Sequence, residues 1–144
     1  MDYLLTCMSK SLSKLKSKTI LKAVYCNGYS TEKISIDSFQ YLKCLGKGVA
    51  GSVYLARSKM SGKLFAIKQI EKHYINNYKS FENILREKKI MTELKDNPYT
   101  AKFHCSFESA HHLNFILEFY PGGELFHHIT QHSLSEEYIR LYFC

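Results

Sequence analysis

Three glycines and a lysine have the types and spacing of a phosphate-binding site. Gly46, Gly48 and Gly51 fall within six residues, and the run Ala66-Ile67-Lys68 follows at residue 66. Glycine has no side chain, so backbone N–H groups around it can approach phosphate oxygens closely. A lysine on a neighbouring strand supplies a mobile positive charge. The pattern predicts a phosphate-binding turn over residues 46–51.

The residues after Gly51 exclude a dinucleotide-binding fold as the source of this pattern. In that fold the third glycine opens a helix inside a βαβ unit. Here residues 52–56 read Ser-Val-Tyr-Leu-Ala, a β-rich run, and the next β-rich run starts too soon for a crossover helix. Glu71, 20 residues after Gly51, therefore does not have the ribose-binding role that this spacing would suggest. The glycines are expected to lie between two antiparallel strands.

The elements that must position these residues alternate in a simple order along the chain. Short β-rich runs bounded by turn residues predict strands, and apolar positions at helical spacing predict an amphipathic helix that ends before Pro98. The predicted strands are residues 39–45, 52–57, 64–70, 102–108 and 112–118, and the predicted helices are residues 79–94, 124–131 and a segment after Ser135. A turn is expected at residues 121–123.

Taken together, these residues resemble the amino-terminal lobe of a eukaryotic protein kinase. The three glycines with Val53 match GxGxxGxV, and residues 66–68 match the lysine motif of the third strand. Glu87 has the position of the glutamate that the family requires on the following helix. The resemblance implies an α+β fold over residues 39–144: a five-stranded antiparallel sheet with a regulatory helix, then the hinge and the first helices of the carboxy-terminal lobe. It also implies that Lys68 binds the α- and β-phosphates of ATP and that Glu87 holds Lys68 by an ion pair.

Residues 114–124 are similar to the kinase hinge, the segment that joins the two lobes. Leu117 falls at the gatekeeper position, and the resemblance implies that backbone groups of Glu118 and Tyr120 bind the adenine edge. Val53 and Ala66 would sandwich the adenine ring. The run Pro-Gly-Gly-Glu-Leu-Phe is most similar to the AGC group of serine/threonine kinases.

ATP is the cofactor that the resemblance implies. The implied nucleotide contacts are Gly46, Lys47, Gly48, Val49, Ala50, Gly51, Val53, Ala66, Lys68, Leu117, Glu118, Tyr120 and Glu124, the last near the ribose. Ala50 departs from the family, because many relatives have an aromatic residue at the tip of the glycine loop. The backbone donors of the loop are unaffected by that difference.

The motifs that complete a kinase active site do not occur in these 144 residues: there is no His-Arg-Asp, no Asp-Phe-Gly and no Ala-Pro-Glu. We therefore expect Mg²⁺ only in a full-length enzyme, assign no metal ligand here, and expect this chain alone to transfer no phosphate. Apolar side chains near the end of the sequence are expected to lack partners: Leu125, Phe126, Ile139, Leu141, Tyr142 and Phe143. Met91 and Phe103 would belong to a hydrophobic spine that continues into the two absent motifs.

Two functions from different classes stay open. The first is the ATP-binding part of a serine/threonine kinase that transfers the γ-phosphate of ATP to Ser and Thr hydroxyls of proteins. The second is a non-catalytic, kinase-like module that binds nucleotide or docks on another protein. Retention of both Lys68 and Glu87 favours the first, because a docking module has no physical need for the pair.

Residues 1–38 are predicted to form a basic, Ser- and Lys-rich extension. Five lysines lie in the first 22 residues, and apolar residues from Leu5 to Leu15 recur at helical spacing. Such a segment can contact an anionic membrane through residues 1–22 or remain a solvated extension. Residues 39–144 contain 14 basic and 10 acidic residues, a balance that gives no argument for nucleic-acid binding.

The remaining composition favours an intracellular protein, cytoplasmic or nuclear. The five cysteines are odd in number and widely spaced without a CxxC pair, which favours reduced thiols over a disulfide framework or a zinc site. No apolar run reaches the roughly 18 residues of a membrane span, and the amino terminus lacks the order of a secretory signal. The histidine pairs at residues 111–112 and 127–128, with His132, lack the spacing of metal ligands.

Overall fold

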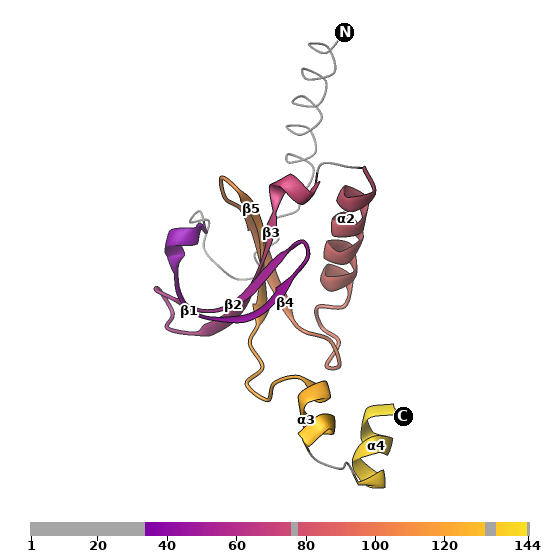
Figure 1. The fold of residues 1–144 in the computed structure, drawn as a ribbon. Helices are drawn as coiled ribbons and strands as arrows, with labels where there is room; N and C mark the ends of the chain where they lie inside the picture. Colours follow the sequence, from indigo (N-terminus) through magenta and orange to yellow (C-terminus); the bar gives the residue numbers. More distant parts are fainter. Residues whose placement is uncertain (1–33, 76–77, 132–134, 144) are drawn as a thin grey trace.

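A computed structural model describes residues 34–75, 78–131 and 135–143 of the chain. Most of the predicted basic extension therefore lies outside the described residues. The elements, in chain order, are η1 (Ile36–Ser38), β1 (Phe39–Gly48), β2 (Gly51–Ser58), β3 (Leu64–Glu71), η2 (Lys72–Ile75), α2 (Tyr78–Glu93), β4 (Phe103–Glu108), β5 (His112–Glu118), α3 (Leu125–Gln131) and α4 (Glu136–Phe143) (Figure 1).

The five strands form one antiparallel sheet in the order β1-β2-β3-β5-β4, and α2 lies beside it (Figure 1). This arrangement confirms the predicted α+β fold with its single helix between the third and fourth strands. The two short 3₁₀ helices, η1 and η2, were not predicted, because three or four residues carry no measurable periodicity. No helix within the described residues is long and apolar enough to cross a bilayer.

The predicted turn over residues 46–51 is too long. β1 continues to Gly48 and β2 starts at Gly51, with Gly46 paired to Val53 and Gly48 paired to Gly51. Only residues 49–50 form the turn, as in the two-residue connections that antiparallel hairpins favour. The glycines extend the ladder because strand pairing requires only backbone groups.

One face of the sheet is covered by α2. Buried side chains of β3, β4 and β5 pack there against Phe81 and Ile84 of the helix, and the cluster comprises Ile70, Phe81, Ile84, Phe103, Leu113 and Phe115. Strand register places Lys68 and Ala66 on this same face, because alternate residues of a strand point to the same side. The helix covers the Ile70 end of β3 and leaves the Ala66 end half-buried.

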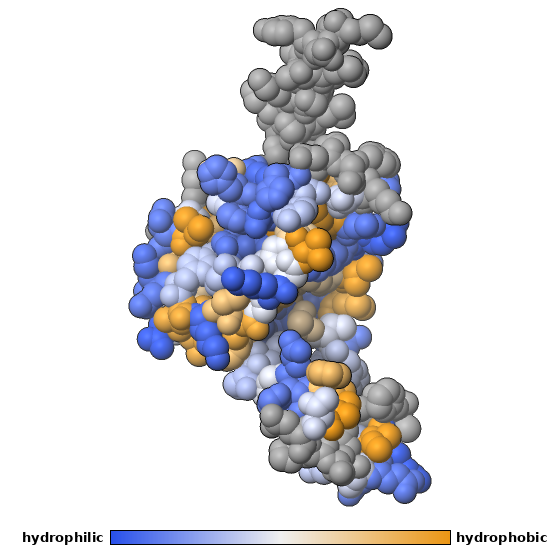
Figure 2. Space-filling model, in the orientation of Figure 1, coloured by the Kyte–Doolittle hydropathy of each residue, from blue (hydrophilic) through white to orange (hydrophobic). Residues whose placement is uncertain are grey.

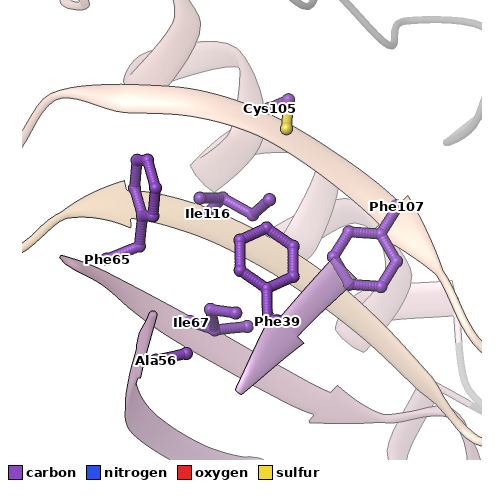
Figure 3. Packing of buried hydrophobic residues seen from close by; sticks show 7 residues of the cluster. All are labelled: Phe39, Ala56, Phe65, Ile67, Cys105, Phe107 and Ile116. Atoms are coloured by element: carbon purple, nitrogen blue, oxygen red, sulfur yellow. The ribbon is translucent and has the colours of Figure 1, made fainter. Parts of the chain in front are cut away.

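The opposite face holds a second core cluster, which includes residues from both edges of the sheet (Figure 3). Phe39 of β1 stacks on Phe107 of β4 with ring centroids 6.2 Å apart and packs edge-on against Phe65 at 6.1 Å. Because β1 and β4 are the two edge strands, this contact requires a strongly curled sheet. The curled sheet encloses Ala56, Ile67, Cys105 and Ile116.

A chain of polar side chains crosses the sheet beside this second cluster. Gln69 Nε2 donates to the Tyr41 hydroxyl at 3.1 Å and to Asn114 Oδ1 at 2.9 Å, and Asn114 Nδ2 donates to the Phe107 carbonyl at 3.3 Å. Burial raises the pKa of Tyr41; the hydrogen bond from Gln69 opposes this rise and the neighbouring Tyr54 adds to it. Asn114 is fully buried, so these bonds replace all of its contacts with water.

Replacing Asn114 by leucine should lower the free energy of unfolding by about 1–3 kcal/mol, because one Gln69 N–H and the Phe107 carbonyl then lose a partner in the protein interior. Urea denaturation measures the change. Asn83→Leu is the matched control: Asn83 lies exposed on α2, and its replacement should alter stability by no more than about 0.5 kcal/mol. Equal effects of the two substitutions would contradict a stabilising role of the polar chain.

The last two helices extend away from the sheet and expose apolar side chains (Figures 1 and 2). Phe126 and Ile129 on α3 and Tyr138 and Ile139 on α4 are exposed. This confirms the expectation for Phe126 and Ile139, whereas Leu125 is half-buried. Leu141, Tyr142 and Phe143 lie outside the described side chains.

Candidate nucleotide-binding site

An ion pair between β3 and α2 marks the candidate site. Lys68 Nζ donates to Glu87 Oε1, which is the contact expected from the sequence. Lys68 lies in the middle of β3, between Val53 of β2 and Phe115 of β5. The two side chains are 34% and 39% exposed, so the lysine is fixed in position yet open to an anion from solvent.

An apolar surface lies next to Lys68 on the same face of the sheet. Val53 is the direct neighbour of Lys68 on β2, and Ala66 is paired with Leu117 of β5. All three apolar residues are half-buried. Because Val53 and Ala66 share one face, they can cover only one side of a flat ring. Val53 and Ala66 could therefore form only one of the two sides of the expected sandwich around the adenine ring.

The glycine hairpin formed by β1 and β2 borders this surface. A Cβ atom built on Gly46 would meet no atom within 4 Å, whereas one on Gly51 would lie 1.9 Å from the Gln69 carbonyl oxygen of β3. The Glu71 N–H donates to the Ala50 carbonyl at 3.1 Å, which ties the tip of the hairpin to the end of β3. The side chains of Lys47 and Val49 are exposed. There is therefore room for a side chain or a ligand at Gly46, whereas Gly51 is packed closely against the backbone of β3.

The predicted hinge, residues 114–124, begins inside β5 and continues past the end of that strand. Leu117 packs against the cluster under α2, and Glu118 closes β5. Tyr120 and Glu124 follow in the exposed segment between the end of β5 and α3. The structure brings Lys68, Glu87, Val53, Ala66 and Leu117 to one face of the sheet.

One contact at the hinge was missed in the sequence. His104 Nε2 lies 2.7 Å from Glu118 Oε2, and the imidazole ring packs edge-on against Phe65 with centroids 5.1 Å apart. The register of β4 against β5 shifts between Phe103 and Cys105. No pattern in the sequence predicts such a shift in strand register, because the shift changes the direction of a single side chain.

Two further features lie near α2. Met91 packs against the cluster that contains Phe103, so the two residues expected in a hydrophobic spine are close together. Burial lowers the pKa of Lys88 on the inner side of α2, and the nearby Cys105 acts in the opposite direction. Within the described ranges, Cys44 and Cys105 form no disulfide, and no group of three or more His, Cys, Asp or Glu side chains could hold a metal ion.

Comparison with known proteins agrees with this geometry. The sequence profile of the protein kinase domain matches residues 39–144. The chain is 34% identical over 108 residues to protein kinase C eta type of Homo sapiens, covering 75% of this chain and 16% of that protein. It is 36% identical over 105 residues to serine/threonine-protein kinase Sgk3 of Rattus norvegicus, covering 72% of this chain and 21% of that protein.

A third relative matches a longer part of this chain. The RAC serine/threonine-protein kinase of Drosophila melanogaster is 30% identical over 130 residues, which cover 90% of this chain and 21% of that protein. The chain thus spans about a fifth or less of the length of these relatives. The match includes the glycine hairpin, the Lys68–Glu87 pair and the hinge. The chain belongs to the protein kinase family and is similar to its AGC-group serine/threonine kinases.

Proposed function

We propose that this chain is the ATP-binding part of a serine/threonine protein kinase. The observation that carries the proposal is the Lys68–Glu87 ion pair, held beside the half-buried apolar surface of Val53, Ala66 and Leu117. A fixed cation next to a flat apolar surface suits a ligand with a phosphate at one end and an aromatic base at the other. ATP has both.

The residues have distinct roles in this proposal. Lys68 binds the α- and β-phosphates, and the carboxylate of Glu87 keeps the lysine directed toward them. The open space at Gly46 leaves room for a phosphate to approach the backbone of the glycine hairpin. Val53 and Ala66 cover one side of the adenine ring, while backbone groups of Glu118 and Tyr120 bind its edge and Glu124 lies near the ribose.

Phosphoryl transfer would also require groups that the 144 residues do not contain. An aspartate must orient the substrate hydroxyl, and Mg²⁺ must be held on the phosphates. Within the described part of the chain no cluster of side chains suits such a metal ion. We therefore propose that the 144-residue chain binds ATP without transferring its γ-phosphate, and that transfer to protein Ser and Thr hydroxyls belongs to a longer product.

The deciding experiment is titration of the 144-residue chain with ATP by isothermal titration calorimetry, together with sequencing of the transcript past the Cys144 codon. Saturable ATP binding and a reading frame that continues into His-Arg-Asp and Asp-Phe-Gly would support the kinase. Saturable binding with a stop codon after Cys144 would support the non-catalytic nucleotide-binding module. An absence of ATP binding would overturn the site.

Glu87→Gln should weaken ATP binding by about 2- to 5-fold, because a neutral amide holds the Lys68 ammonium less firmly than a carboxylate does. The effect is small because water reaches both side chains and screens the pair. Calorimetry with ATP measures it. The control is Glu108→Gln, which changes a lysine–glutamate pair outside the site, Lys72–Glu108. Unchanged ATP affinity in Glu87→Gln would contradict the role assigned to Glu87.

A further inference from the structure

The start of the hinge is held by contacts with His104 of β4 and with Lys102, the residue before β4. The Glu118 N–H donates to the Lys102 carbonyl at 2.9 Å, and the Lys102 N–H donates to the Tyr120 hydroxyl at 3.4 Å. His104 adds the side-chain contact to the Glu118 carboxylate. Three contacts therefore connect two hinge residues to Lys102, the residue before the edge strand β4, and to His104 within it.

A β-bulge places His104 for this contact. Phe103 is paired with Leu117 and Cys105 with Ile116, so one additional residue, His104, stands between two successive pairs. Phe103 belongs to the cluster under α2, whereas Cys105 belongs to the cluster on the opposite face. A bulge of this kind changes the direction of a side chain. Here it brings the imidazole to the end of β5.

The ring of His104 is fixed on two sides. Phe65 packs edge-on against it, and Phe65 is itself the cross-strand partner of Glu118. His104 is 18% exposed and Glu118 is 42% exposed. A carboxylate can only accept hydrogen bonds, so Nε2 of His104 carries the hydrogen in this contact. Phe65, His104 and Glu118 thus form one packed group on the sheet face opposite Lys68.

We propose that His104 is a positioning residue for adenine recognition: it fixes the Glu118 side chain and so holds the hinge backbone where an adenine edge can bind. The inference rests on the proposed function, because it assumes that a nucleotide base contacts Glu118. His104 itself lies on the other face of the sheet and does not touch the nucleotide. It acts through Glu118, as contacts one step removed from a ligand commonly do.

His104 should affect recognition of the base and not binding of the phosphates. ATP and inosine triphosphate carry the same ribose and triphosphate, but inosine has a carbonyl where adenine has an amino group. A displaced hinge should weaken recognition of the adenine edge and leave contacts to Lys68 and the glycine hairpin intact. A loss of folding would weaken both nucleotides together.

The test compares the affinities of the 144-residue chain for ATP and inosine triphosphate in three variants. His104→Leu should weaken ATP binding by about 3- to 30-fold and leave inosine triphosphate binding unchanged. His104→Gln, whose amide N–H can replace the Nε2 donor, should restore ATP affinity. His111→Leu is the control for loss of an exposed histidine and should change neither affinity.

Three outcomes decide the matter. Selective loss of ATP affinity in His104→Leu with recovery in His104→Gln supports the inference. Unchanged ATP affinity, or an equal loss for both nucleotides, overturns it while the ATP site itself stands. If the unchanged chain binds neither nucleotide, the proposed function fails, and adenine positioning by His104 fails with it.

Discussion

Lys68→Met should weaken ATP binding by about 10-fold and lower phosphoryl transfer by at least about 100-fold in a longer product that contains the catalytic loop. Methionine has nearly the length of lysine but no charge, so it can occupy the same space between Val53 and Phe115. The fold should therefore persist. Calorimetry on the 144-residue chain measures binding, and radiolabelled phosphate incorporation into a protein substrate measures transfer.

The chain contains a close control for this substitution. Lys72 also forms an ion pair with a glutamate, Glu108, and its side chain is 32% exposed, against 34% for Lys68. Lys72 lies at the start of η2, outside the candidate site. Lys72→Met should leave ATP affinity unchanged. Equal losses in the two variants, or full transfer by Lys68→Met, would show that Lys68 has no special role.

The sheet, the helix and the Lys68–Glu87 pair could be predicted because each leaves a local signal in the sequence. Alternating apolar residues define strands, and helical spacing defines α2. The pair of Lys68 and Glu87 follows from a family motif and is confirmed by the contact between the two side chains. The roles of the nucleotide-contact residues stay predictions until binding is measured.

The polar chain across the sheet could not be predicted, because its members are distant in the sequence. Gln69 is 28 residues from Tyr41 and 45 residues from Asn114. Asn114 stands within an otherwise apolar run, and no local pattern distinguishes a buried asparagine with partners from an exposed one. Strand register alone brings Gln69 and Asn114 together as a cross-strand pair.

The different surroundings of Gly46 and Gly51 could not be predicted from the sequence either. The motif treats Gly46 and Gly51 alike, yet only Gly51 packs against the β3 backbone. Neither glycine has a positive φ; within the described residues that conformation occurs only at Gly62 and Gly123. Close approach therefore explains the glycine at residue 51, whereas left-handed backbone geometry does not.

Gly51→Ala should lower the free energy of unfolding by about 1–3 kcal/mol. The added methyl group would stand 1.9 Å from the Gln69 carbonyl oxygen, 2.9 Å from the Gln69 carbonyl carbon and 3.0 Å from Ile70 Cα. These are backbone atoms of the paired strand, so they can move away from the methyl group only if β2 and β3 separate at the Gly51–Ile70 pair. Urea denaturation measures the loss of stability.

Gly46→Ala is the same substitution on the facing strand β1, and it should affect ATP affinity and not stability. A methyl group at Gly46 meets no atom within 4 Å, so stability should stay within about 1 kcal/mol of the unchanged chain. That space is where the proposed phosphate approaches the hairpin backbone, so ATP affinity should fall. If Gly46→Ala bound ATP normally, the phosphate would lie elsewhere. If Gly51→Ala were as stable as Gly46→Ala, the hairpin would not be packed on β3 in solution.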